Sequence, residues 1–274
     1  MRIVLLCGNQ SNQHALAAKI ASEFDLVGIA FESKKSKASY SLSYLFSKII
    51  DRIFFYRIIS SWKNMLKYYR NNFSCPPEII SEIFENINSN DVINFIQQLN
   101  PDLIMVSGTR LIKEDILNLQ PSKGIINLHT GLSPYIRGGP NCTNWCISNN
   151  TIHLIGNTVM WIDKGIDSGN IITTEVLEFS GNESLNDIHI NVMEHAHHLY
   201  IKTLHTIKGN YINCPSAKQS EITNGELFLN KMWNFKAKVK LVYNIISGNF
   251  KKSINSTEYN KKRKKLILIE LPKK

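Results

Sequence analysis

An amide, an imidazole and a carboxylate that could act together lie within residues 124–172. Asn127 and His129 occupy alternate positions after a short apolar run, so their side chains point to the same face of an extended segment. Asp167 follows a second strand-like run, residues 155–162. If the two strands end side by side, these three polar groups meet at one place.

Such a set suits the transfer of an acyl or formyl group to an amine. The amine attacks a carbonyl carbon, so the site needs a donor for the developing oxyanion and a group that manages the proton shed by the nitrogen. Asn127 can donate, and the imidazole of His129 can both take and give a proton near neutral pH. Asp167 can orient that imidazole. The alternative is that Asn127 and Asp167 serve turns and that His129 is a satisfied polar residue at the edge of a core.

The same segment resembles the folate-dependent formyltransferase family, whose members move a formyl group from 10-formyltetrahydrofolate to an amine. The family pattern has an Asn-x-His, a Leu-x-Pro and a basic residue before Gly, and then a Thr-Val strand that ends in Asp-x-Gly-x-Ile-Ile. The matching residues are Asn127, His129, Leu132, Pro134, Arg137, Gly138, Thr158, Val159, Asp167, Gly169, Ile171 and Ile172. The likeness extends more loosely from Met1 to about residue 205. Many members carry a His two residues after the Thr of the strand, and this chain has Met160 there.

The resemblance implies 10-formyltetrahydrofolate as formyl donor and Asn127, His129 and Asp167 as catalytic residues. It also implies a pterin pocket formed by a turn after a buried strand and by the loop before Asp167. The residues expected to bind the folate are Thr109, Arg110, Leu111, Ile112, Ile162, Asp163 and Gly165. The residues expected to bind the acceptor substrate are Asn9, Gln10, Ser11, Asn12, Arg137 and Gly138.

The elements that position these residues alternate between strand and helix. Strands are expected at residues 2–7, 26–31, 103–107 and 155–162, and helices from the turn at 8–12 through residue 24, at 89–99 and at 185–207. This alternation predicts an α/β fold, an open doubly wound, Rossmann-like sheet. Ligands bind beyond the carboxyl ends of the strands in such sheets, which is where the candidate residues would meet.

The turn at residues 8–12 joins a strand to a helix, so backbone N–H groups and the positive end of the helix dipole point to one spot. A very similar Gly-Asn-x-Ser-Asn turn holds the substrate phosphate in glycinamide ribonucleotide formyltransferases. An ordinary turn with an Asn or Ser cap is the alternative.

The net charge of +10 is unevenly distributed. Residues 33–70 hold nine Lys/Arg and one acid, residues 231–274 hold thirteen and two, and the remainder carries −9. From Tyr40 to Tyr69 apolar residues recur at helical spacing with basic residues between them, which predicts amphipathic helices. These helices would pack on the body or on a partner subunit, or rest on a membrane surface. The basic segments would face a phosphate-bearing partner, an anionic membrane or solvent alone.

Length and apolar content, 274 residues and 43%, allow one full core with a smaller attachment. We expect a formyltransferase catalytic domain at residues 1–210, with a basic helical insertion at 33–75, and a small basic α+β appendage at 211–274. That appendage is too short for the tRNA-binding barrel of methionyl-tRNA formyltransferases.

Five irregularly spaced cysteines argue against a disulfide framework, and no apolar run approaches the ~20 residues of a membrane span. A cytoplasmic location is therefore expected. Neither Cys142 with Cys146 nor His195 with His198 has a third ligand at metal-binding spacing, so no metal is expected.

The stretch from Pro134 to Trp145 looks more like the loop of sugar N-formyltransferases than that of the purine enzyme. Those relatives formylate nucleotide-linked amino sugars, such as dTDP-4-amino-4,6-dideoxyhexoses, for surface polysaccharides including O-antigen and lipopolysaccharide. The expected partners are therefore a nucleotide-linked amino sugar and folate, without nucleic acid, and with a homodimer and peripheral membrane contact left open. The alternatives are phosphoribosylglycinamide formyltransferase, methionyl-tRNA formyltransferase and a folate-binding module without turnover.

Overall fold

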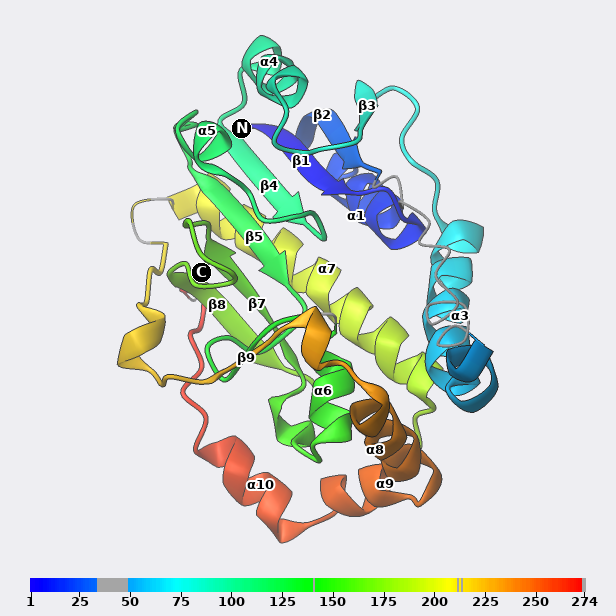
Figure 1. Cartoon of the computed structure of the whole chain (residues 1–274). Helices are drawn as coiled ribbons and strands as arrows, with labels where there is room; N and C mark the ends of the chain where they lie inside the picture. Colours follow the sequence, from blue (N-terminus) through cyan, green and yellow to red (C-terminus); the bar gives the residue numbers. More distant parts are fainter. Residues whose placement is uncertain (34–48, 140, 211, 213, 273–274) are drawn as a thin grey trace.

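A seven-stranded sheet forms the centre of the chain, in the order β3-β2-β1-β4-β5-β7-β8 (Figure 1). The computed structural model describes residues 1–33, 49–139, 141–210, 212 and 214–272. The strands are β1 Arg2–Gly8, β2 Asp25–Glu32, β3 Ser81–Phe84, β4 Leu103–Ser107, β5 Ile125–His129, β7 Gly156–Trp161 and β8 Ile171–Val176. The strands are parallel from β3 to β5, whereas β7 is antiparallel to both β5 and β8. The predicted Rossmann-like α/β fold is confirmed.

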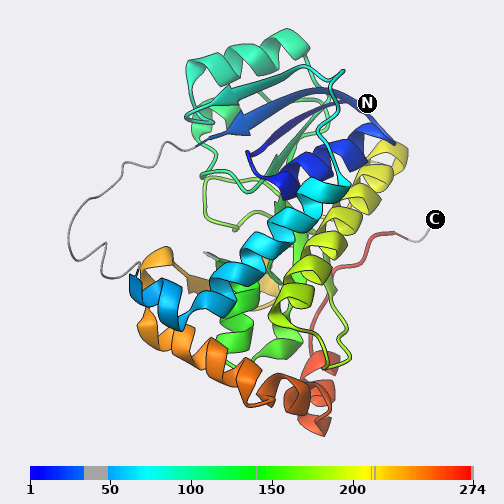
Figure 2. The ribbon, with the colours of Figure 1, turned by 90° about the vertical axis from the view of Figure 1, so that its right-hand side faces the viewer.

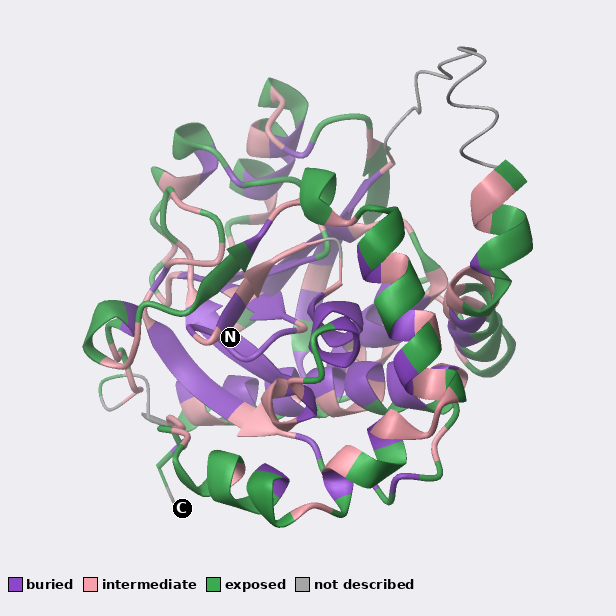
Figure 3. Ribbon diagram, turned by 60° about the horizontal axis from the view of Figure 1, so that its bottom comes forward, coloured by how far each residue is buried: buried purple, intermediate pink, exposed green. Residues whose placement is uncertain are grey.

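Helices cover both faces of the sheet, because alternate side chains of β1 point to opposite sides. The helices are α1 Ser11–Ala21, α3 Tyr56–Asn72, α4 Asn90–Leu99, α5 Glu114–Leu117 and α7 Leu185–Asn210. Ile3 and Leu5 pack in one core with α1 and α7, and Val4 and Leu6 pack in another with α4 and α5. The strands are buried in the middle and the outer helix faces are exposed (Figure 3).

The predicted amphipathic segment lies partly outside the described residues, which begin again at residue 49. Residues 49–54 are helical and α3 follows them. Figure 2 shows α3 beside α7, and the buried side chains of Met65 and Tyr69 pack with Ala15 of α1 and Met193 of α7. This part of the insertion therefore packs on the body. Within the described ranges, no helix has both the length and the apolar content needed to cross a membrane.

The C-terminal residues pack against the loop after β5. The stretch after β5 forms β6 Ile136–Gly138, α6 Cys142–Ser148 and the 3-10 helix η1 Ile152–Leu154. The C-terminal residues form the 3-10 helices η3 Gln219–Glu221 and η4 Asn230–Met232, β9 Glu226–Phe228, α8 Phe235–Ile246, α9 Asn249–Ile254 and α10 Thr257–Lys264. β9 pairs in parallel with β6, and the Phe228 ring stacks on Trp145 at 4.3 Å between centroids. One apolar core contains residues from the stretch after β5 and from the C-terminal residues.

Two C-terminal segments lie along the outer edge of β8. The backbone of Ala217 exchanges hydrogen bonds of 2.8 and 2.9 Å with Ile171. Further along, the Thr174 N–H donates to the carbonyl of Ile269 at 2.9 Å. The apolar run 266–269 has the composition of a strand, but it makes too few backbone bonds to form one.

The hydroxyl of Tyr200 joins α7 to the strands beneath the predicted catalytic residues. It accepts the Val106 N–H at 3.0 Å and lies 2.9 Å from the carbonyl of Ile126 and 3.1 Å from that of Val106. The side chain is fully buried. Because water cannot replace this partner, its loss leaves buried backbone groups unsatisfied.

Tyr200→Phe is therefore expected to lower the free energy of unfolding by roughly 1–3 kcal/mol. Urea unfolding measures this loss. Tyr243, which is exposed, gives the matched control, because Tyr243→Phe is expected to change stability by less than about 0.5 kcal/mol. Equal effects of the two substitutions would contradict the role of the Tyr200 hydroxyl.

Candidate active site

A pocket of about 860 Å³ opens at the carboxyl ends of β1, β4 and β5, and it brings most of the predicted residues together. Asn127, His129 and Asp167 line it. All seven residues expected to contact folate also line it, namely Thr109, Arg110, Leu111, Ile112, Ile162, Asp163 and Gly165. Of the residues expected to contact the acceptor, Asn9, Gln10, Asn12 and Gly138 line the pocket, whereas Ser11 and Arg137 do not.

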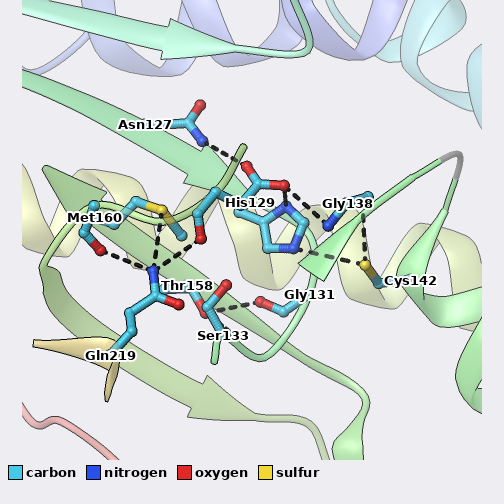
Figure 4. A network of polar contacts seen from close by, with 11 residues as sticks. Asn127, His129, Gly131, Ser133, Gly138, Cys142, Thr158, Met160 and Gln219 are labelled. Atoms are coloured by element: carbon cyan, nitrogen blue, oxygen red, sulfur yellow. Dashed lines mark hydrogen bonds and ion pairs between the residues drawn. The ribbon is translucent and has the colours of Figure 1, made fainter. Parts of the chain in front are cut away.

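The three central side chains meet because β5 and β7 pair in antiparallel register. His129 lies opposite Thr158 and Asn127 lies opposite Met160. The loop after β7 then brings Asp167 within reach of Asn127 and His129, both of which Figure 4 labels. Asp167 Oδ1 accepts the Asn127 amide at 3.4 Å, and Asp167 Oδ2 lies 3.4 Å from His129 Nδ1. The carboxylate thus orients both the amide and the imidazole.

Backbone geometry fixes the position of the Asp167 carboxylate. Asp167 has φ +48, in the left-handed region that Asp and Asn enter more readily than most residues. Two residues later, a Cβ on Gly169 would lie only 1.8 Å from the carbonyl oxygen of Trp161, so the close approach requires glycine. The Gly138 N–H donates to Asp167 Oδ2 at 3.1 Å from the other side of the site.

The second imidazole nitrogen, His129 Nε2, faces the thiol of Cys142 at 3.6 Å. Burial raises the pKa of the Cys142 thiol well above its ordinary value, so the sulfur stays protonated. It also lies 3.5 Å from the carbonyl of Gly138, to which it donates. His129 itself is 8% exposed. The imidazole is therefore held on both sides, by a carboxylate at Nδ1 and by a neutral thiol at Nε2.

A buried carboxylate that the sequence analysis did not single out holds the turn after β4. Glu32 accepts the Arg110 N–H at 2.8 Å and the Ile87 N–H at 3.2 Å, and its side chain is 1% exposed. The Arg110 guanidinium lies 3.5 Å from it. The sequence offers one indication of this role, because Glu32 directly follows the strand predicted at residues 26–31. Glu32 thereby fixes the backbone of the turn expected to bind the pterin.

Segments outside the family-like stretch contribute the rest of the lining. Trp62 comes from α3, and Phe228, Leu229 and Asn230 follow from β9 into η4. No local motif marks these residues, because they reach the pocket only through the packing of α3 and β9. The insertion and the C-terminal residues therefore shape the same pocket as the Asn127–His129 strand.

At the α1 end of the pocket, one residue of the predicted 8–12 turn does not face the lining. The hydroxyl of Ser11 donates to the Leu66 carbonyl of α3 at 2.5 Å, so it points away from the pocket. Asn12 and Gln13 line the pocket, are 2% and 6% exposed, and each has a side-chain oxygen without a partner. This end of the pocket thus presents buried amides, with α3 beside it.

The described residues contain no group of three side chains that could hold a metal ion. His195 instead lies 3.2 Å from Glu175 and 2.8 Å from the amide of Asn157. His198 is exposed.

Formyltransferases are similar to this chain in sequence and in fold. Residues 72–204 match the family described as Formyl transferase. Among curated relatives, the methionyl-tRNA formyltransferase of Alkaliphilus oremlandii is 36% identical over 48% of this chain and 42% of its own length. That of Clostridium tetani is 29% identical over 58% of this chain and 51% of its own length. The chain thus spans about half the length of the curated relatives it matches.

Solved structures share the fold over a larger part of the chain. A 4-N formyltransferase from Francisella tularensis superposes with a TM-score of 0.54 at 20% identity, over 87% of this chain and 86% of the other. Phosphoribosylglycinamide formyltransferase from Bacillus halodurans gives 0.53 at 18% identity, over 78% and 98%. The part of the chain that contains Asn127, His129 and Asp167, residues 72–204, is thus similar to the formyl transferase family.

Proposed function

We propose that this protein transfers the formyl group of 10-formyltetrahydrofolate to the amine of a nucleotide-linked amino sugar. The observation that carries the proposal is the Asp167 carboxylate between Asn127 and His129 at the wall of the pocket. The pocket volume of about 860 Å³ lies within the range of small-molecule sites. The turn of residues 108–112, held by Glu32, offers backbone groups to a pterin ring.

In the proposed reaction, Asn127 and His129 stabilise the oxyanion that forms when the amine attacks the formyl carbon. The Asn127 amide has two N–H donors, and Asp167 occupies one of them. Asp167 also holds the imidazole at Nδ1. The proton shed by the amine passes, directly or through water, to the departing folate nitrogen, with the Asp167–His129 pair managing it.

An amino sugar is favoured over glycinamide ribonucleotide by the arrangement at α1. Ser11 is engaged with α3, so one donor of the predicted phosphate site is withdrawn from the pocket. Trp62 and the residues 228–230 add aromatic, apolar and amide groups to the lining, which suits an extended acceptor better than a phosphate monoester. A sugar N-formyltransferase from a Shewanella species has the same fold, with a TM-score of 0.53 at 17% identity, over 88% of this chain and 86% of the other.

Methionyl-tRNA formylation is the second candidate, because the curated relatives carry that name. It would require RNA to bind the basic segments, with an affinity that falls steeply as salt is added. A homodimer and a contact of the basic segments with a membrane stay predictions.

The test is a transfer assay with 10-formyltetrahydrofolate and a panel of acceptors. The panel holds dTDP-, UDP- and GDP-linked amino sugars, glycinamide ribonucleotide and charged initiator tRNA. Formylation of one nucleotide-linked amino sugar alone is the expected result. Exclusive reaction of the ribonucleotide or of the tRNA would replace the proposed acceptor, and folate binding without transfer to any amine would refute the proposed activity.

A further inference from the structure

The segment of residues 215–219 follows the family-matched part of the chain and lies against the β7–β8 hairpin. Ala217 exchanges two backbone hydrogen bonds with Ile171. The indole of Trp161 donates to the carbonyl of Pro215 at 3.2 Å, and the Asn170 amide donates to the hydroxyl of Ser216 at 3.0 Å. These bonds fix the segment directly before Gln219.

The side-chain amide of Gln219 reaches the loop that carries Asp167 (Figure 4). Its Nε2 donates to the carbonyl oxygen of Asp167 at 2.8 Å and to that of Gly169 at 2.8 Å. One NH₂ group has two hydrogens, so both donors of this amide are used on the same loop. Gln219 is 7% exposed, and Met160 Sδ lies 4.0 Å from its Nε2. Water has little access to take over these bonds.

The two carbonyls belong to the part of the loop with the least conformational freedom. Asp167 has a left-handed backbone, which costs energy for a residue with a side chain, and Gly169 must be glycine to pass Trp161. Holding the carbonyls on both sides of Ser168 fixes the orientation of the peptide planes. Since the Asp167 Cα belongs to one of those planes, the direction of the carboxylate toward His129 is fixed as well.

We propose that Gln219 is a positioning residue, which holds the Asp167 carboxylate in place for His129 and Asn127 through the backbone of the 167–169 loop. The proposal rests on the function proposed above and extends it beyond residues 72–204, because the C-terminal segment completes the active site. A purely structural role would affect stability without changing the contact between Asp167 and His129.

The first test compares Gln219→Met with wild type in the transfer assay. Methionine keeps the length and volume of the side chain and removes both donors. The expected result is a kcat lower by roughly 10- to 100-fold, because a displaced catalytic group loses the reactive geometry, with an unchanged Kd for the folate. The matched control is Ser216→Ala, which removes a hydrogen bond of the same segment but none to the 167–169 loop; its kcat is expected to equal that of wild type.

The second test needs no turnover. The NMR signals of the His129 ring nitrogens are expected to move in Gln219→Met, because the Asp167 carboxylate that lies 3.4 Å from Nδ1 in wild type is displaced. The Ser216→Ala control is expected to keep the wild-type signals. If wild type formylates no acceptor, the proposed function fails, and this NMR comparison still decides the role of Gln219.

Unchanged kcat and unchanged NMR signals of the His129 ring in Gln219→Met would overturn the proposal. Equal losses of kcat in Gln219→Met and Ser216→Ala would also overturn it, because they would assign the effect to the whole segment of residues 215–219. If Gln219→Met does not fold, Gln219→Asn replaces it. Its amide is one methylene shorter and cannot span both carbonyls, so the same loss of kcat is expected, and wild-type kcat in this variant would refute the positioning role.

Discussion

His129→Ala is expected to lower kcat for formyl transfer by at least about 10³-fold. An oxyanion donor is worth roughly 3–4 kcal/mol of activation free energy, and a positioned acid or base adds to that. The substitution removes both groups at once, together with one of the two partners of Asp167 Oδ2. The Kd for the folate is expected to change little, because the predicted pterin contacts come from the turn at residues 108–112 and the loop before Asp167.

Single-turnover rates with saturating 10-formyltetrahydrofolate measure this effect without interference from product release. His198→Ala, at an exposed position of α7, is the matched control and is expected to retain wild-type activity. A residual rate in His129→Ala within tenfold of wild type would exclude the imidazole as the central catalytic group. It would leave Asn127 and the pocket backbone as the main source of transition-state stabilisation.

Acidification from pH 7.5 to pH 5 is expected to lower the free energy of unfolding by about 4 kcal/mol, half from each of two buried histidines. Burial and the nearby Lys19 lower the pKa of His197 to about 3, and burial lowers that of His189 to about 4, from an ordinary value of 6.5. Both are neutral in the folded protein, so the unfolded chain binds more protons as the pH falls below 6.5. Stability therefore decreases between pH 6.5 and the folded pKa values.

The surroundings of these histidines support this direction. His197 Nδ1 lies 3.4 Å from the ammonium of Lys19, which opposes a second positive charge, and its Nε2 has no partner. Lys19 in turn pairs with Glu194 at 2.8 Å. The pKa of Glu175, lowered to about 2 by its bond to His195, affects stability only below pH 4.5.

Urea unfolding at pH 7.5 and pH 5 tests the prediction in wild type and in His197→Gln. The variant cannot titrate at this position, so its loss of stability between the two pH values is expected to be about 2 kcal/mol smaller than that of wild type. An identical loss in both proteins would show that His197 is charged, or exposed to water, in the folded state.

The sequence predicted the features that depend on local spacing. The alternation of Asn127 and His129 follows from the two-residue period of a strand, and the continuous apolar run at residues 103–107 indicates burial on both faces. Most of the predicted pocket residues depend on these elements alone, and they line the pocket.

The features that the sequence did not predict depend on contacts between distant segments. Nothing near Gln219 or Trp62 in the chain indicates that they reach the site, since the packing of the C-terminal residues and of α3 brings them there. The same packing engages Ser11 with Leu66, against the expectation that Ser11 binds the acceptor. Cys142 meets His129 only because the loop after β5 turns back on itself.

The bonds of residues 217 and 269 along β8 bear on the solubility of the chain. A sheet edge with unpaired N–H and C=O groups is a template for strands of other molecules, and proteins avoid aggregation by covering it. Ala217 and Ile269 occupy such groups on Ile171 and Thr174. A chain cut after residue 210 would leave that edge open beside the candidate active site, and we expect it to join other copies edge to edge.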